Sequence, residues 1–334
     1  MKRGIRLKEK ILKLLKDSKN EFISGQEISQ QLNVSRTAIW KYINALKEEG
    51  YEIESVSRKG YMLLSTPDIL NYEEIRKYLE TKHIGREIFY FDTLDSTNLK
   101  AKELAANEQK EGTVVIAEEQ TNGRGRLGRS WSSPKKKGIW MSIILTPEIE
   151  PTDAAKVTQV AAAAVWKGIN EVGVKTQIKW PNDIVLNGKK VCGVLTEMSG
   201  ELNRLNYLVV GIGINANMSD EDFPEEIRGL ATSLKIELNK EVERKELIGR
   251  ILNNFEELYE ELIHNNSIDK SIKICVENSA LIGKDVRLIL KGKEEEAKAI
   301  DISKEGELII QDKNGDISKI ISGEVSVRGL YGYV

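Results

Sequence analysis

The sequence predicts an α+β protein with three parts: a helical N-terminal module, a central mixed β-sheet with helices, and a small C-terminal β-barrel. Residues 1–65 show apolar residues at helical spacing and then a short hairpin pattern. Residues 66–270 alternate between β-branched apolar runs and helical segments, and residues 271–334 hold short strands separated by glycine-bearing turns. These patterns predict domains 1–65, 66–270 and 271–334.

Composition excludes several classes of protein. The chain has 334 residues, is 40% apolar and carries a net charge of −2, which suits a soluble protein of two or three domains. Two cysteines, Cys192 and Cys275, and two histidines, His83 and His264, are too few for a disulfide framework, a histidine-based metal site or a Ser-His-Asp triad. The longest apolar run, 160–166, is too short to cross a membrane, and the charged N-terminus is unlike a signal peptide. We therefore expect a cytoplasmic protein with no membrane partner.

Residues 1–65 predict a winged helix-turn-helix that binds DNA. Ser35 is a suitable N-cap for a third helix, and residues 51–54 and 61–64 flank the basic turn 57–60. Basic residues outnumber acidic ones by 13 to 8 in residues 1–66, which favours DNA over a small helical dimerisation module, the alternative for such helices. The candidate DNA-binding residues are Ser24, Ser35, Arg36, Thr37, Trp40, Lys41, Arg58 and Lys59.

Polar residues lie where the first helix of the central part begins. An apolar strand at 87–91 leads through an acidic turn to Ser96, Thr97 and Asn98, and a helix then runs to Ala105. These three residues either cap the helix or present hydroxyl and amide groups to the polar head of a ligand. The pattern leaves both interpretations open.

A glycine- and arginine-rich loop follows the buried strand predicted at 113–117. Residues 123–131 read Gly-Arg-Gly-Arg-Leu-Gly-Arg-Ser-Trp. Glycines allow close backbone approach to a bound group, and arginines suit phosphate and carboxylate. The dinucleotide-binding interpretation fails because residues 129–134 do not begin a helix, and a solvated basic turn is the other alternative. We expect the loop to cradle an anionic intermediate.

Further strands and helices follow this loop. The predicted elements are a core strand at 138–145, an alanine-rich helix at 152–170, strands at 177–180 and 208–215, and a helix at 240–264. Pro181 ends one strand, and Asn187-Gly188 marks a hairpin.

Lys190 begins the second strand of that hairpin. Strand alternation places Lys190, Cys192 and Val194 on one face and Val191 and Leu195 on the other. Such a lysine is either a solvated edge residue or, in a domain with an arginine loop, a phosphate ligand.

The charged candidates form a set without a histidine or cysteine nucleophile. Arg124, Arg126, Asp183 and Lys190 suit phosphoryl or nucleotidyl transfer, which depends on positioning and charge neutralisation. Asp183 can hold Mg²⁺ or steer an incoming amine.

Several motifs together resemble biotin protein ligases. They are residues 120–126 with Trp131 after them, 179–183, 190–193 and 211–215, in that family's order and spacing. With the helix-turn-helix, the chain resembles the bifunctional bacterial form, which is both a biotin ligase and a repressor of biotin-synthesis genes. The resemblance implies a class II synthetase-like catalytic fold.

The resemblance also implies a two-step reaction. Biotin reacts with ATP to give biotinyl-5'-AMP, and a lysine of the biotin carboxyl carrier protein of acetyl-CoA carboxylase then displaces AMP. The implied catalytic residues are Arg126, Asp183, with a possible Mg²⁺, and Lys190. Those implied to bind biotin are Ser96, Thr97, Asn98, Gln120, Arg124, Gly125, Arg126 and Lys190. Those implied to bind ATP or the adenylate are Gly123, Arg124, Arg126, Trp131, Lys179, Asn182, Lys190 and Asn215, with residues 215–223 resembling the adenine-side loop.

The C-terminal strands and the coupling between the parts complete the prediction. Strands are expected at 286–290, 297–302, 308–311, 317–321 and 325–327. The resemblance implies that this barrel helps to hold ATP or the carrier, and that the adenylate acts as corepressor of a homodimer on operator DNA. The alternatives are a lipoate-type ligase, disfavoured by the Gly-Arg-Gly-Arg loop, and a ligand-sensing transcription factor without ligase activity, disfavoured by the intact charged set.

Overall fold

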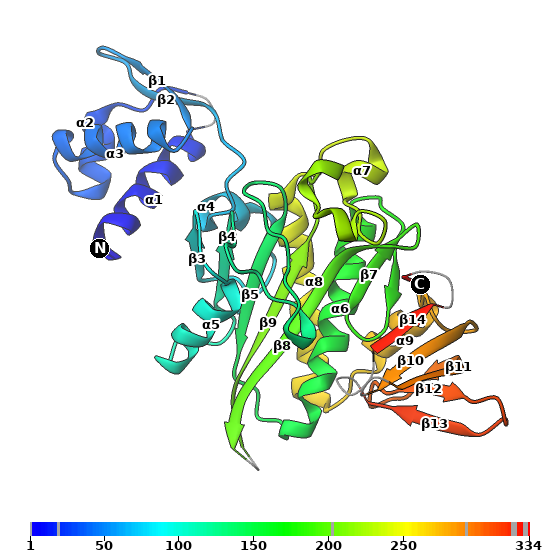
Figure 1. Cartoon of the computed structure of the whole chain (residues 1–334). Coiled ribbons are helices and arrows are strands. Elements are labelled where there is room, and N and C mark those ends of the chain that lie inside the picture. Colours follow the sequence, from blue (N-terminus) through cyan, green and yellow to red (C-terminus); the bar gives the residue numbers. More distant parts are fainter. Residues whose placement is uncertain (1, 19–20, 202–203, 291–292, 322–325, 330–332) are drawn as a thin grey trace. The chain divides into compact units, whose positions relative to one another are not determined.

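The computed structural model describes residues 2–18, 21–201, 204–290, 293–321, 326–329 and 333–334 (Figure 1). The chain divides into two compact units, Met1–Ile69 and Leu70–Val334. The second unit holds both the central sheet and the C-terminal sheet, so the domain boundary expected at residue 271 stays a prediction.

Over residues 2–18 and 21–69, the first unit has three helices and a two-stranded wing. Its elements are α1 (Lys2–Asp17), α2 (Gly25–Leu32), α3 (Arg36–Glu48), β1 (Glu52–Val56) and β2 (Gly60–Ser65). The hydroxyls of Ser24 and Ser35 cap α2 and α3 by accepting the N–H three residues on, at 3.1 and 3.2 Å. Asn33 ends α2 in the left-handed conformation. Ile11, Ile28, Ile39, Ile43 and Leu46 form the buried stripes. The winged helix-turn-helix prediction is confirmed.

A mixed seven-stranded sheet forms the centre of the second unit, in the order β3-β4-β5-β9-β8-β7-β6. The strands are β3 (Ile88–Phe91), β4 (Val114–Ala117), β5 (Ile139–Leu145), β6 (Gln177–Lys179), β7 (Asp183–Leu186), β8 (Lys189–Glu201) and β9 (Arg204–Ile214). Only the β3–β4 pair is parallel among these neighbours. The apolar runs of the sequence predicted these strands because both faces of the sheet are covered.

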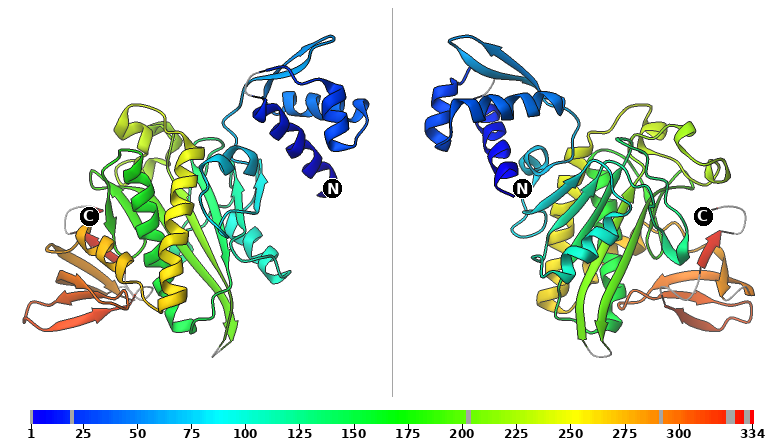
Figure 2. Two further views of the ribbon diagram at one scale, coloured as in Figure 1. Left: turned by 180° about the vertical axis from the view of Figure 1, so that it is seen from behind. Right: turned by 60° about the vertical axis from the view of Figure 1, so that its left-hand side comes forward.

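Helices cover the two faces of this sheet (Figure 2). α6 (Ala154–Glu171) and α8 (Arg244–Asn265) pack together on one face, whereas α5 (Thr97–Ala106) lies on the other. Successive residues of β4 point to opposite faces of the sheet. Val114 and Ile116 belong to the core beneath α6 and α8, whereas Val115 belongs to the cluster with α5. The remaining helices are α4 (Tyr72–Ile75), α7 (Leu234–Leu238) and α9 (Asp269–Glu277), with short 3-10 turns at Arg76–Tyr78, Arg126–Gly128, Pro151–Asp153, Asp220–Asp222 and Glu225–Ile227.

A buried ion pair ties the end of β4 to α8. Arg244 Nη1 lies 2.8 Å from Glu118 Oε2, and both side chains are fully buried. Glu118 also accepts the Leu70 N–H at 3.3 Å and the Tyr90 hydroxyl at 3.2 Å. Burial, followed by the Glu118 charge, raises the pKa of Tyr90 far above its ordinary value. The satisfied network fixes the strand that leads into the glycine–arginine loop.

The C-terminal part is a five-stranded antiparallel sheet in the order β13-β12-β11-β10-β14. Its strands are β10 (Asp285–Leu290), β11 (Lys293–Ile302), β12 (Leu308–Gln311), β13 (Ile317–Ile320) and β14 (Ser326–Gly329). Val325, expected to begin the last strand, lies outside the described residues. No pairing between β13 and β14, which would close the expected barrel, occurs among residues 285–290, 293–321 and 326–329.

One local feature, the pairing of β7 with β8, differs from the sequence prediction. A β-bulge in β8 pairs Val185 with Lys190 and Ile184 with Cys192, so Val191 has no opposite residue. Cys192 and Val191 therefore both face the core, and the predicted face shared by Lys190, Cys192 and Val194 is wrong.

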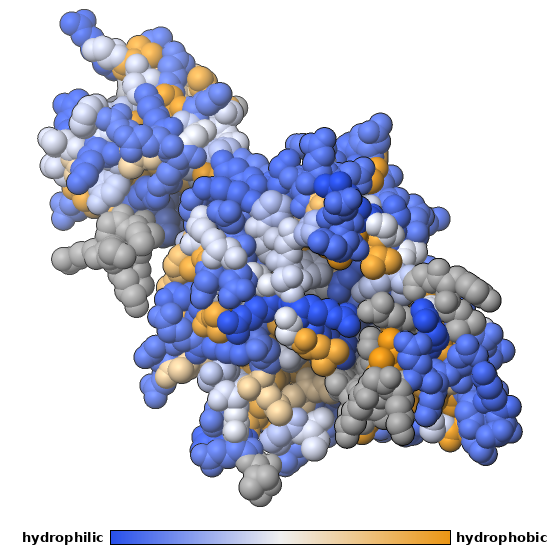
Figure 3. All heavy atoms as spheres, viewed as in Figure 1, coloured by the Kyte–Doolittle hydropathy of each residue, from blue (hydrophilic) through white to orange (hydrophobic). Residues whose placement is uncertain are grey.

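The surface is mostly hydrophilic on the face shown in Figure 3. Over the part of the chain that the structure describes, no helix combines the length and apolar character needed to cross a membrane.

Candidate active site

A cavity of about 350 Å³ lies over the β5–β9–β8–β7–β6 half of the sheet. Its walls come from the start of α5, the glycine–arginine loop, the strand ends, residues 215–231 and the C-terminal sheet. Among the lining residues are Ser96, Thr97, Asn98, Gln120, Arg124, Gly125, Arg126, Trp131, Lys179, Asn182, Asp183, Lys190 and Asn215. The structure thus brings together every sequence-predicted site residue of this unit except Gly123.

Gly123 is not among the residues that line the cavity. A Cβ at this position would approach the Trp131 carbonyl oxygen to 2.3 Å. The Trp131 N–H donates to the Gly123 carbonyl at 2.8 Å. Gly123 therefore allows the loop to fold closely on Trp131, and its contact with the adenylate stays a prediction.

The neutral polar end of the cavity is an ordered network. Ser96 occupies the N-cap position of α5, but its side chain does not cap the helix. Gln120 Oε1 accepts the Thr97 N–H at 2.8 Å instead, and Gln120 Nε2 donates to Ser133 at 2.8 Å. Ser142, from β5, lies beneath this network.

Asn98 is held from three sides. Ser142 Oγ lies 2.6 Å from Asn98 Oδ1, and Asn98 Nδ2 donates to Glu197 Oε2 at 2.7 Å. A Cβ on Gly211 would lie 2.2 Å from Asn98 Oδ1, so only glycine leaves room for this amide. Glu197 also pairs with Lys102. This end can present oriented donors and acceptors to a neutral polar ligand head.

The glycine–arginine loop folds back on itself above the cavity. Gly125 N–H donates to the Arg129 carbonyl at 2.7 Å, and Arg124 forms a β-bridge with Ser130. Arg126 then reaches across, and its Nη1 donates to Asn182 Oδ1 at 2.7 Å. Burial lowers the pKa of Arg126 below its ordinary value, and Asp183 acts against this shift. A cation is thus held over the cavity.

The charged end is built on the β7–β8 pair. Asp183 begins β7 opposite Gly193, and Lys190 Nζ lies 2.6 Å from Asp183 Oδ1. The missing side chain of Gly193 matters here, because a Cβ would lie 3.1 Å from Lys190 Nζ. Lys190 Nζ also lies 5.1 Å from the centre of the Trp131 ring. Lysine and aspartate are therefore placed side by side next to an aromatic wall.

Lys179 and Tyr333 complete this end. The Lys179 ammonium lies 3.5 Å from the centre of the Tyr333 ring, and the Tyr333 hydroxyl donates to Asp183 Oδ2. The ammonium groups of Lys179 and Lys190 can neutralise phosphate. Asp183 is the carboxylate available to a cation or an amine. The residues that the structure describes contain no cluster of three or more His, Cys, Asp or Glu side chains suited to a metal.

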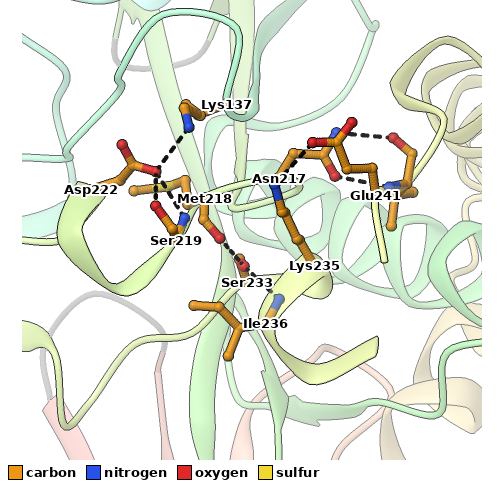
Figure 4. A network of polar contacts seen from close by, with 10 residues as sticks. Lys137, Asn217, Met218, Ser219, Asp222, Ser233, Lys235, Ile236 and Glu241 are labelled. Carbon is orange, nitrogen blue, oxygen red and sulfur yellow. Dashed lines mark hydrogen bonds and ion pairs between the residues drawn. The ribbon is translucent and has the colours of Figure 1, made fainter. Parts of the chain in front are cut away.

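The opposite wall is apolar and is formed by residues 218–231. Met218, Phe223, Ile227, Leu230 and Ala231 line the cavity there. Polar contacts outside the cavity fix this segment, as Figure 4 shows.

Several of these contacts anchor the segment at its start. Ser233 Oγ donates to the Met218 carbonyl at 2.6 Å, and Ser219 and Asp222 form a capping box whose carboxylate lies 3.4 Å from Lys137 Nζ. Asn217 Oδ1 accepts the Val242 N–H at 2.8 Å, and Asn217 Nδ2 donates to the Val242 carbonyl at 3.0 Å. A flat apolar group fits against such a wall.

The candidate DNA-binding residues lie in the first unit. Arg36, Thr37, Trp40 and Lys41 are exposed on the first turns of α3, and Trp40 keeps 59% of its surface accessible. Arg58 and Lys59 are exposed in the turn of the wing. Ser24 and Ser35 use their hydroxyls as helix caps.

No local sequence pattern marks three further residues of the site. Ser142 lay inside a continuous apolar strand, Glu197 in the polar half of a long strand, and Tyr333 beyond the last predicted strand. Each reaches the site only through strand pairing or through the arrangement of the C-terminal sheet.

Three family models match successive parts of the chain. Residues 89–215 match the biotin/lipoate A/B protein ligase family, residues 7–62 match an HTH domain, and residues 281–328 match the biotin protein ligase C terminal domain.

Relatives match nearly the whole length. The chain is 43% identical to the bifunctional ligase/repressor BirA of Bacillus subtilis over 96% of this chain and 98% of the relative. It is 29% identical to BirA of Escherichia coli, with 96% of each chain covered. The biotin protein ligase of Aquifex aeolicus, solved in complex with biotin and ATP, superposes with a TM-score of 0.64 at 30% identity over 73% of this chain and 99% of that one. Because identity, coverage and fold agree, this chain belongs to the biotin/lipoate A/B protein ligase family.

Proposed function

We propose that this chain is an ATP-dependent biotin protein ligase that also represses biotin-synthesis genes. One observation carries the ligase part: a neutral polar end, an arginine loop, a cluster of charged groups and an apolar wall meet in one cavity. These are the four surfaces that a biotin head, a mixed phosphoric anhydride and an adenine base require. Membership of the family, with ligase/repressors among the relatives, supports the assignment.

In the first step, the biotin carboxylate forms a bond to the α-phosphorus of ATP, and pyrophosphate leaves. The Thr97–Asn98–Gln120 network orients the neutral head, while Arg126, Lys179 and Lys190 neutralise the negative charge. Such catalysis depends on positioning and on electrostatic stabilisation. The buried Nε1 of Trp131 has no hydrogen-bond acceptor among the residues described, and this observation supports a ligand-binding role for the cavity.

Mg²⁺ accompanies ATP in this proposal. Asp183, whose carboxylate lines the cavity, would hold this cation. When bound, the cation reduces the charge on the phosphates. The protein residues then bind and orient the two substrates.

In the second step, the amine of a carrier lysine attacks the anhydride carbonyl, an amide forms, and AMP leaves. Asp183, whose carboxylate lines the cavity, orients this amine. The intermediate must be kept from water until then, and a loop that closes through the Arg126–Asn182 bond does so. The carrier is the biotin carboxyl carrier protein of acetyl-CoA carboxylase.

The repressor function uses the first unit. The adenylate favours a homodimer, and two helix-turn-helix units then bind a two-fold operator in the cytoplasm. The exposed residues of α3 and the basic turn of the wing support this assignment.

Mass spectrometry of the purified protein with biotin, ATP and Mg²⁺, with and without a biotin carrier domain, tests the ligase. We expect biotinyl-5'-AMP without the carrier, and a biotin mass shift on one carrier lysine with release of AMP. Folded protein that makes neither product would overturn the ligase assignment. Transfer of lipoate in place of biotin would show that the protein is a lipoate-type ligase.

A further inference from the structure

Tyr333 contacts two charged groups of the cavity at once. Its hydroxyl donates to Asp183 Oδ2, and its ring lies under the Lys179 ammonium, 3.5 Å from ring centre to nitrogen. Tyr333 and Val327 both line the cavity, although they belong to the C-terminal part of the chain. The Tyr333 contacts therefore join the C-terminal part of the chain to the charged end of the cavity.

The hydroxyl and the ring have separable effects. Lys190 holds Asp183 Oδ1 at 2.6 Å, and the Tyr333 hydroxyl holds the other oxygen, so the carboxylate plane is set from both sides. Lys179 is only 4% exposed, and a buried ammonium gains from an aromatic face. Removing the hydroxyl takes away the contact to Asp183 Oδ2, whereas removing the ring also takes away the aromatic contact of Lys179.

We propose that Tyr333 is a positioning residue for both steps of the reaction, an inference that rests on the proposed ligase function. Its ring holds Lys179 ready for the phosphates of ATP in the first step. Its hydroxyl holds Asp183 in the orientation that receives the carrier amine in the second step. The C-terminal part of the chain thereby contributes to the chemistry through one side chain.

The test separates the two steps in the full-length protein. Adenylate formation is followed by pyrophosphate release at varied ATP, and transfer is followed in single turnovers from preformed biotinyl-5'-AMP to the carrier domain. Tyr333→Phe keeps the ring, so we expect an unchanged KM for ATP and a transfer rate about tenfold lower. Tyr333→Leu loses both contacts, so we expect the same slow transfer and, in addition, a KM for ATP raised about threefold to tenfold.

Tyr207→Phe is the matched control, because Tyr207 packs against the cluster of Val115, Ile144 and Val209 on the α5 face of the sheet and is not a lining residue of the cavity. Its two rates should equal those of the wild type. Wild-type transfer by Tyr333→Phe, or an equal rise of the KM for ATP in both Tyr333 variants, would overturn the proposal. If Tyr333→Leu does not fold, Tyr333→Phe still decides the role of the hydroxyl. A wild-type protein that forms no adenylate would instead contradict the ligase function itself.

Discussion

Arg126 Nη1 donates a 2.7 Å hydrogen bond to Asn182 Oδ1, which joins the glycine–arginine loop to the turn between β6 and β7. Asn182 is itself fixed, because its Nδ2 donates to the Val194 carbonyl at 2.8 Å and its own carbonyl accepts the Val194 N–H. The loop is therefore anchored to a rigid strand pair, next to Asp183. A single side chain closes the cavity over its charged end.

Arg126→Gly should separate formation of the adenylate from its retention. The substrates still reach the cavity, but the loop loses its anchor and a cation that faces the anhydride. We expect adenylate to form and to dissociate at least tenfold faster, because bonds to charged groups contribute about 1.5–3 kcal/mol. Release is measured by diluting the loaded enzyme and separating free from bound adenylate with time.

Lys136→Gly is the control for this loop experiment. Lys136 is exposed and has a positive φ of 60°, so glycine suits its backbone. It should retain adenylate normally. Normal retention by Arg126→Gly as well would contradict the role of the loop.

Ser142→Ala should weaken binding of biotin. Ser142 Oγ lies 2.8 Å from Thr97 Oγ1 and 2.6 Å from Asn98 Oδ1, so its loss leaves both side chains less firmly oriented. We expect a KM for biotin raised about threefold to tenfold with little change in the KM for ATP. Ser318→Ala, at an exposed site on β13, should change neither constant. An unchanged KM for biotin in Ser142→Ala would show that the network does not orient the ligand.

The sequence predicted the fold and most of the cavity because each signal was local. The motif residues Asn182 and Asp183 directly follow one strand, and the glycine–arginine loop follows another. Their positions at strand ends were enough to predict that they lie in one site. The three helices of the first unit have caps and apolar stripes that act within each helix.

The rest depended on contacts between distant segments. The bulge at Val191 arises from pairing of β7 with β8 and reverses strand alternation around Lys190. Ser142 is a polar residue within an apolar strand, and its role appears only when α5 lies over β5. Tyr333 reaches Asp183 across 150 positions of sequence, which no local pattern can reveal.

Arg36→Ala should weaken DNA binding without affecting ligation. Arg36 is exposed at the first position of α3, where a cation can contact phosphate. We expect a lower affinity for operator and non-operator DNA alike, with a slope of log K against log salt reduced by about one. Lys13→Ala removes an exposed charge from α1 and should leave the slope unchanged. An unaltered slope in Arg36→Ala would remove this residue from the DNA interface.

Biotin and ATP together should raise operator affinity, whereas either alone should not. The adenylate can only shift the monomer–dimer equilibrium by its differential affinity for the dimer. Titration of operator DNA by fluorescence anisotropy, with sedimentation of the same samples, measures both quantities. Operator affinity that is independent of both substrates would end the repressor proposal and leave the ligase untouched.

Glu256→Gln should destabilise the second unit in a pH-dependent way. Glu256, on α8, accepts the backbone N–H groups of Lys82, His83 and Ile84, the last two at 2.8 and 2.7 Å. Burial alone would raise the pKa of Glu256, but these three bonds outweigh it and hold the pKa below its ordinary value. The carboxylate therefore stabilises the fold most fully above the ordinary pKa of about 4.3, and this stabilisation is lost as the pH falls through the lower folded value.

The substitution replaces one acceptor oxygen by an NH₂ group that faces backbone donors. We expect a loss of about 2 kcal/mol in the free energy of unfolding at pH 7, measured by urea denaturation. The difference from the wild type should be constant between about pH 6 and 8 and should shrink below about pH 4. Glu257→Gln, one position along the helix and exposed, should cost less than about 0.5 kcal/mol. A constant difference down to acidic pH would mean that packing, and not the charge on Glu256, joins α8 to residues 82–84.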